Sequence, residues 1–231
     1  MSYYALFFGS VIGFVGSAFL VASVLLPSPQ PTAPRGIYDR TTRGMRIYLA
    51  TPRLRGLLSL NLTAAAAGAM VLVNTVVLVR ANLGLGDAQV AIALGAFGGG
   101  SMLAALLLPR LLDNFPDRPV MIGGAAVLVI SLLSLSLISL IYDTQWLPLL
   151  AGWFVIGIGY SVVLTPSGRL LKRSAHAEDR PAVYAAQFAL SHACWLVTYP
   201  LAGWLITITG PTTAFAFLAL LAAIGIICGV L

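Results

Sequence analysis

The sequence predicts an all-α integral membrane protein with seven transmembrane helices. Of 231 residues, 59% are hydrophobic and only 9% are charged, whereas roughly a quarter of an average soluble domain is charged. A helix that rises about 1.5 Å per residue needs roughly 20 apolar residues to cross a hydrocarbon core of about 30 Å. The chain contains seven runs of about this length, over residues 2–26, 56–80, 88–112, 119–141, 146–168, 182–206 and 211–231.

The pattern within these runs favours helices over a transmembrane β-barrel. Barrel strands alternate in polarity over about ten residues, but segments such as Ala125 to Leu133 are almost continuously apolar. The run over residues 2–26 could be read as a secretory signal. It lacks a preceding basic segment, and it is longer than the apolar part of a signal peptide. We therefore expect it to span the membrane.

The basic residues predict how the helices are oriented. Twelve of the thirteen lie in one set of connections, and Arg80 lies in the other. Cytoplasmic loops are the ones rich in Lys and Arg, so we expect a multi-pass protein of the cell inner (plasma) membrane with its N-terminus outside and its C-terminus in the cytoplasm. The twelve are Arg35, Arg40, Arg43, Arg46, Arg53, Arg55, Arg110, Arg118, Arg169, Lys172, Arg173 and Arg180.

The net charge of +6 follows from this bias, and it indicates anionic lipid headgroups as partners and not nucleic acid. Cys194 and Cys228 both lie in apolar runs, where a small buried hydrophobic side chain is the usual role of cysteine. No disulfide framework is expected.

We expect three parts along the chain: a solitary transmembrane helix over residues 1–26, a basic cytoplasmic linker over 27–55 and a six-helix transmembrane bundle over 56–231. The linker begins with four prolines between Pro27 and Pro34, which favour an extended chain. Apolar and arginine side chains then interleave from Gly36 to Leu49. This predicts an amphipathic helix in the inner headgroup layer, with a solvated basic loop as the alternative.

Short turns join the last six runs. Turns such as those over residues 143–145 and 207–210 force neighbouring helices to run antiparallel and to pack side by side. Glycines in the third and fifth runs allow close helix contact, either in static packing or in a moving helix pair. These are Gly98, Gly99, Gly100, Gly152, Gly157 and Gly159.

Four segments of the sequence match motifs of a known protein family. In the connection over residues 109–118, PRLLDNFPDR, the positions of Leu111, Asp113 and Arg118 agree with a Gly-x-Leu-Ala-Asp-x-x-Gly-Arg-Arg loop, whereas Pro109, Pro116 and Asp117 depart from it. The connection thereby resembles the loop of permeases of the major facilitator superfamily. Three further segments resemble nickel-resistance type efflux permeases. They are RIYLATPRLRGL (46–57), PSGRLLKRS (166–174) and QFALSHACWLVTYPLAGW (187–204).

The resemblance implies the second half of such a permease, from its sixth to its twelfth helix, with a six-helix half-bundle of the major facilitator type. It implies transport of a small molecule or ion by alternating access, as secondary-active efflux of a divalent metal such as nickel or of a drug. The partner implied is a missing N-terminal half or a second copy. The connection at Arg110, Asp113, Asp117 and Arg118 would then form a gating charge cluster, or be an ordinary solvated loop.

The candidate substrate-binding residues lie mainly on the sixth run. No Asp, Glu, Lys or Arg occupies the middle of any run, so His192 is the candidate for handling a proton, because histidine changes charge in the physiological range. At 100° per residue, Trp195, Tyr199 and His192 continue a polar stripe that contains Gln187, Ser191, Cys194 and Thr198. The alternative is that these side chains bind neighbouring helices.

Asn74 on the second run is a further candidate, either lining the cavity or joining helices. A metal site is not expected. His192 and Cys194 are two residues apart and point about 160° from each other on a helix, so they cannot bind one ion together. Met70 could add a soft ligand but is more typical of a core position.

Other functions fit less well. The sequence shows no nucleophile with a base, no phosphate-binding loop and no metal quartet, so neither an enzyme nor a cofactor is expected. A heptahelical receptor shares the seven spans, but a retinal Schiff base needs a lysine within a span, and Lys172 lies at a helix end. An inactive product of a truncated permease gene stays open as an alternative.

Overall fold

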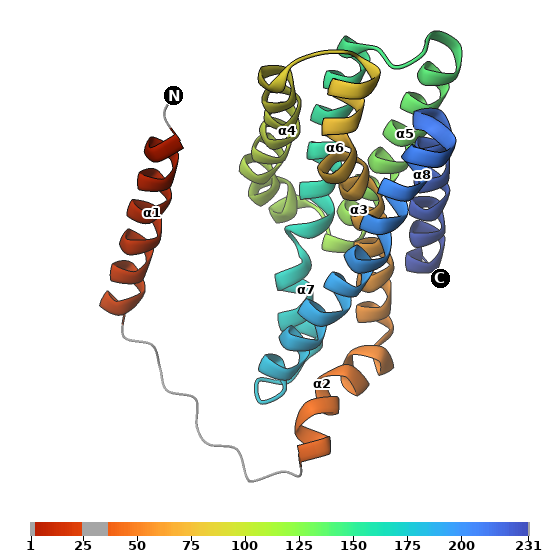
Figure 1. The fold of residues 1–231 in the computed structure, drawn as a ribbon. Coiled ribbons are helices and arrows are strands. Elements are labelled where there is room, and N and C mark those ends of the chain that lie inside the picture. Colours follow the sequence, from red (N-terminus) through yellow and green to blue (C-terminus); the bar gives the residue numbers. More distant parts are fainter. Residues whose placement is uncertain (1–2, 25–36, 231) are drawn as a thin grey trace. The chain divides into compact units, whose positions relative to one another are not determined.

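The computed structural model describes residues 3–24 and 37–230, and side chains within 7–24 and 42–230. The chain divides into two compact units, residues 1–35 and 36–231. The described part of the first unit is one apolar helix, α1 (Tyr3–Ser23), which lies within the run predicted over 2–26. The four prolines at the start of the predicted linker, between Pro27 and Pro34, lie outside the described residues. All regular structure described in either unit is helical, as expected (Figure 1).

The second unit contains the predicted bundle. Its elements are α2 (Ile37–Ala50), α3 (Pro52–Val76) with a π-helical end η1 (Val77–Asn82), α4 (Asp87–Asn114), α5 (Asp117–Tyr142), α6 (Trp146–Leu164), α7 (Ser167–Ser174) and α8 (Arg180–Val230). Among the described residues, five helical stretches are long and apolar enough to cross a membrane. The segment over residues 37–50 is the helix α2 and not the basic loop that was the alternative.

α8 accounts for two of the predicted spans. It contains 51 residues and is interrupted at Gly210, whose φ of 80° and ψ of 176° are not helical, with Pro211 next in the chain. Glycine tolerates this φ because it has no Cβ. The chain reverses there, so residues 180–209 and 211–230 form two antiparallel helices (Figure 1). The six spans predicted for the bundle are therefore present.

α3 lies at the centre of the second unit. Every residue from Thr63 to Val71 is buried, including four consecutive alanines. Small side chains let α8, α5, α6 and α4 approach α3 from several sides. A helix that is apolar around its whole circumference is expected to be buried in this way.

Two glycines bring α4 and α6 into backbone contact. A Cβ added to Gly100 would lie 2.0 Å from the carbonyl oxygen of Phe154, and one added to Gly157 would lie 2.1 Å from that of Phe97. By contrast, a Cβ on Gly98 would meet nothing within 4 Å. The close approach predicted for the glycine-rich runs is therefore made by particular glycines and not by the whole set.

Hydrogen bonds join the helices at several depths. The Trp153 indole donates to the Thr75 hydroxyl over 2.7 Å, linking α6 to α3. The Thr63 hydroxyl donates to the carbonyl of Ala222 over 2.8 Å, linking α3 to the second part of α8. In a membrane each such bond contributes roughly 0.6 kcal/mol on average, so packing supplies most of the bundle's cohesion.

The connections divide between two ends of this unit. The α4–α5 turn, α7, the first turn of α3 and the end of α8 lie at one end, and the η1–α4 and α5–α6 connections lie at the other (Figure 1). Arg80 lies at the second end, paired with Asp87 over 3.2 Å. The first end carries the other basic residues of the bundle, namely Arg53, Arg55, Arg110, Arg118, Arg169, Lys172, Arg173 and Arg180. We call the first the basic end. Its assignment to the cytoplasm stays a prediction.

Candidate functional site

Four rings form a ladder along one face of the first part of α8. The ring centroids of Phe188 and His192 are 4.0 Å apart, those of His192 and Trp195 5.6 Å, and those of Trp195 and Tyr199 5.8 Å. Residues spaced by three and four positions stack on one side of a helix. We call Phe188, His192, Trp195 and Tyr199 the ring ladder. It unites three of the predicted site residues and adds Phe188.

His192 is exposed within this ladder, and its ring has a defined hydrogen bond. Nδ1 lies 2.7 Å from the carbonyl oxygen of Phe188. A carbonyl only accepts, so Nδ1 carries the proton and donates it. In the neutral ring Nε2 then keeps its lone pair, which can accept a proton or a hydrogen bond from a solute. The geometry thus leaves the imidazole one reactive nitrogen.

The rest of this helix separates a buried side from an apolar exposed side. Thr198 is fully buried, whereas Leu196 is 75% exposed and Val197 is 62% exposed. Apolar side chains exposed on a membrane helix face lipid or another protein surface. The ring ladder lies beside the buried side, at the border between the two.

Gln187 is engaged by α2. The Tyr48 hydroxyl donates to Oε1 of Gln187, and burial raises the pKa of Tyr48, which is fully buried, above its ordinary value. Nearby, the Arg43 guanidinium holds Asp179 with two hydrogen bonds, of 2.7 and 3.2 Å. α2 is therefore docked on α8, and Gln187 is a docking residue as well as a candidate for substrate contact.

Asn74 lies apart from the exposed ring ladder, inside the bundle. It is fully buried, and its Nδ2 donates to the carbonyl of Ala202 over 3.1 Å and approaches the sulfur of Met70 at 3.2 Å. Its Oδ1 has no hydrogen-bond partner in the described structure. Asn74 thus joins α3 to α8, as in the alternative that it joins helices. Its unpartnered oxygen could bind a water molecule or a solute.

The predicted gating residues are distributed over several contacts. Asp117, at the start of α5, is nearly buried and pairs with Arg173 at 2.9 Å and with Arg169 at 3.6 Å, both from α7. Arg118 instead donates to the carbonyl of Val230 over 2.7 Å, at the end of α8. Asp117 is an anion at the N-terminus of α5, and Arg118 is a cation at the C-terminus of α8. Both charges interact favourably with the dipole of the helix whose end they occupy.

Arg110 and Asp113 are exposed. Within the described ranges, neither forms an ion pair with Asp117 or Arg118. The structure therefore ties the α4–α5 connection to α7 through Asp117 and to α8 through Arg118, and does not gather the four predicted residues into one cluster.

Replacing Asp117 with asparagine is expected to lower the free energy of unfolding by about 1–2 kcal/mol. The substitution leaves Arg169 and Arg173 without a counter-charge, and their partial exposure limits the loss below that of a fully buried pair. Thermal unfolding of purified protein in detergent measures this effect. Asp113→Asn is the matched control, with an expected change within about 0.5 kcal/mol. Equal effects of both variants would show that Asp117 has no structural role beyond loop charge.

Sequence reasoning missed Arg169 and Arg173 as partners of Asp117. It treated residues 169–180 as a connection, whereas 167–174 form α7. The spacing of four was a usable signal, because it places both guanidinium groups on one helix face. The contacts of Tyr48 and Arg43 with α8 had no such signal, since their partners are 139 and 136 residues away.

Comparison with known proteins identifies the family of the six-helix bundle. A search of curated proteins finds no match. The profile described as Major Facilitator Superfamily matches residues 57–231, which begins one residue after the predicted start of the six-helix bundle and covers most of the chain. The members of that family are transporters and not enzymes. The chain, with its six antiparallel spans and no described strand, belongs to the major facilitator superfamily.

Proposed function

We propose that the chain carries a small organic solute out of the cell by alternating access, driven by a proton gradient, with the ring ladder of α8 as its contact surface for the solute. The observation that carries this proposal is the ladder itself. Three aromatic rings and an imidazole lie in contact in an unbroken row on a partly exposed face, beside a side that is fully buried at Thr198.

The chemistry of the row suits an aromatic or cationic solute. Ring faces stack on aromatic molecules and attract cations. Nickel, the substrate class suggested by the resemblance, needs several nitrogen or sulfur ligands in one place. His192 is exposed whereas Cys194 is half-buried, and within the described residues no three His, Cys, Asp or Glu side chains group together. These observations favour an organic solute.

His192 is also our candidate for proton coupling. Ionisable side chains within spans are rare and commonly serve proton or substrate paths, and the middle of each span carries no Asp, Glu, Lys or Arg. Proton binding at Nε2 would place a positive charge between Phe188 and Trp195. A cationic solute and a proton would then compete for the same face, which is the basis of exchange between them.

Alternating access needs a second bundle against which the first can rock. We propose that the exposed faces of α8 and α4 meet a complementary six-helix half or a second copy of this chain. α4 contributes large exposed side chains to the surface, including Met102, Leu103 and Leu106. An extensive exposed apolar surface supports contact with a partner or lipid. The alternative of an inactive fragment predicts no transport under any condition.

Transport driven by a pH gradient in proteoliposomes tests the proposal. Ethidium, an aromatic cation, and Ni²⁺ are each loaded separately, and an imposed pH gradient supplies the driving force. We expect gradient-dependent movement of ethidium and none of Ni²⁺ above the level of protein-free liposomes. Movement of Ni²⁺ with no movement of ethidium would overturn the assignment to an organic solute. Movement of neither would overturn the transport proposal for this chain.

A further inference from the structure

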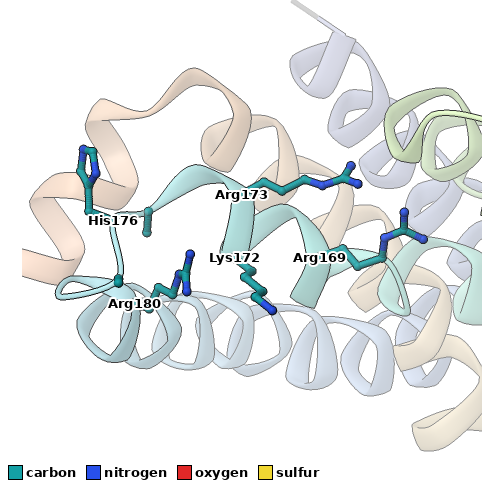
Figure 2. A pocket seen from close by; sticks show the side chains of 7 residues that line it. Arg169, Lys172, Arg173, His176 and Arg180 are labelled. Atoms are coloured by element: carbon teal, nitrogen blue, oxygen red, sulfur yellow. The ribbon is translucent and has the colours of Figure 1, made fainter. Parts of the chain in front are cut away.

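A basic cleft lies between α7 and the start of α8. It has a volume of about 590 Å³, and none of the described side chains that line it is a carboxylate. Figure 2 shows Lys172 reaching from α7 and Arg180 from the start of α8. We call it the basic cleft. Its lining residues are Arg169, Lys172, Arg173, Ala175, His176, Ala177 and Arg180.

Two of the four cations already share one carboxylate. Arg169 and Arg173 pair with Asp117 and turn away from Lys172 and Arg180 in Figure 2. In the part of the chain that the structure describes, Lys172 and Arg180 have no ion-pair partner. Their positive charge is therefore available to a ligand.

Neighbouring acids do not cancel this charge. Asp179 is held by the Arg43 guanidinium, whose Nε lies 2.7 Å from Oδ1. Glu178 is exposed and is absent from the lining of the cleft. α8 begins at Arg180, and the start of a helix carries partial positive charge. Both helices that line the cleft, α7 through Lys172 and α8 through Arg180, therefore contribute positive charge to it.

Two buried polar atoms beside the cleft have no hydrogen-bond partner. They are Nε of Arg180, which can only donate, and Oγ of Ser174, between the lining residues Arg173 and Ala175. A buried donor without an acceptor is unfavourable, and native structures rarely leave one unpaired. This independent observation indicates that an acceptor group beyond the described residues completes the site.

We propose that the basic cleft binds the phosphate group of an anionic ligand, supplied by a phospholipid headgroup or by free phosphate. Guanidinium groups match phosphate oxygens in geometry, and lysine adds a compact charge. Basic pockets where helices meet the membrane surface recognise anionic headgroups. α7 directly follows the apolar run of α6 at the basic end, so the cleft lies at the level of the headgroups. The proposal is independent of the solute carried.

Binding of phosphatidylglycerol and of inorganic phosphate to the purified full chain tests it. The site variant is Lys172→Gln with Arg180→Gln. The matched control is Arg53→Gln with Arg110→Gln, which removes the same charge from exposed positions at the same end, outside the cleft. Native mass spectrometry counts bound lipid in mixed micelles with phosphatidylcholine, and a thermal shift at constant ionic strength reports phosphate against chloride.

We expect the site variant to bind about 30-fold more weakly and the control variant to change less than about 3-fold, because each cation near a headgroup contributes about 1 kcal/mol, which is a factor of about five. Circular dichroism and size exclusion verify that both variants are folded, and Lys172→Arg with native Arg180 should retain binding. Binding of lipid without free phosphate assigns a headgroup, and binding of phosphate alone assigns a soluble anion. Equal weakening in both variants, or no selectivity over phosphatidylcholine and chloride, overturns the site.

Discussion

Replacing His192 with alanine is expected to lower solute transport by about 10- to 100-fold. The substitution removes the reactive Nε2 and interrupts the ring ladder between Phe188 and Trp195, whose centroids lie 4.0 and 5.6 Å from that of His192. Loss of a hydrogen bond to a charged group costs about 1.5–3 kcal/mol, and each 1.4 kcal/mol is a factor of ten. Initial rates in proteoliposomes measure the effect.

Leu196→Ala is the matched control. Leu196 lies one turn from His192 on the same helix and is 75% exposed on the apolar side, so its truncation is expected to change the rate less than about 3-fold. If Leu196→Ala were as damaging as His192→Ala, the loss would reflect packing of α8 against lipid or a partner, and the ladder would have no special role.

His192→Gln separates solute binding from proton coupling. Glutamine keeps a hydrogen-bonding side chain but takes up no proton near neutral pH. We therefore expect solute exchange between the two sides to persist while acceleration by a pH gradient is lost. An unchanged response to the gradient would remove His192 from the coupling mechanism.

Replacing Gly157 with alanine is expected to destabilise the bundle by about 1–3 kcal/mol. The added Cβ would lie 2.1 Å from the carbonyl oxygen of Phe97 on α4, so α4 and α6 must separate, and overpacking of this kind carries a cost of that size. Gly100→Ala meets the carbonyl of Phe154 at 2.0 Å and should behave alike. Thermal unfolding in detergent measures both.

Gly98→Ala is the control, on the same helix, α4, as Gly100. Its Cβ would enter open space, and alanine favours a helix by about 1 kcal/mol over glycine, so stability should hold or rise. Destabilisation of all three variants to the same degree would contradict the backbone contact between α4 and α6. The two tight glycines and the open one could not be told apart from sequence, because each lies in an apolar run.

The helices were predictable because their signal is local. An apolar run long enough to cross a bilayer leaves its backbone no alternative to internal hydrogen bonds, so the six bundle spans follow from composition and length. The bend at Gly210 also had a local cause, in a glycine followed by Pro211. The basic loops could be located but not their structure, and α7 went unrecognised within one of them.

The site was predictable only in part, because contacts between distant segments leave no periodic trace. Helical spacing correctly places His192, Trp195 and Tyr199 in one row. It could not show that Gln187 binds Tyr48 of α2 or that Asn74 reaches the carbonyl of Ala202. Those partners depend on how the helices pack in three dimensions.

Labelling of cysteine from water tests the central claim that the ring ladder borders a solute path. In a background of Cys194→Ser and Cys228→Ser, His192→Cys and Leu196→Cys are treated with a membrane-impermeant maleimide in sealed vesicles. We predict rapid labelling at position 192, slowed by ethidium, and slow labelling at 196, which faces lipid or a partner. Equal labelling of the two positions, with no protection by ethidium, would contradict the account.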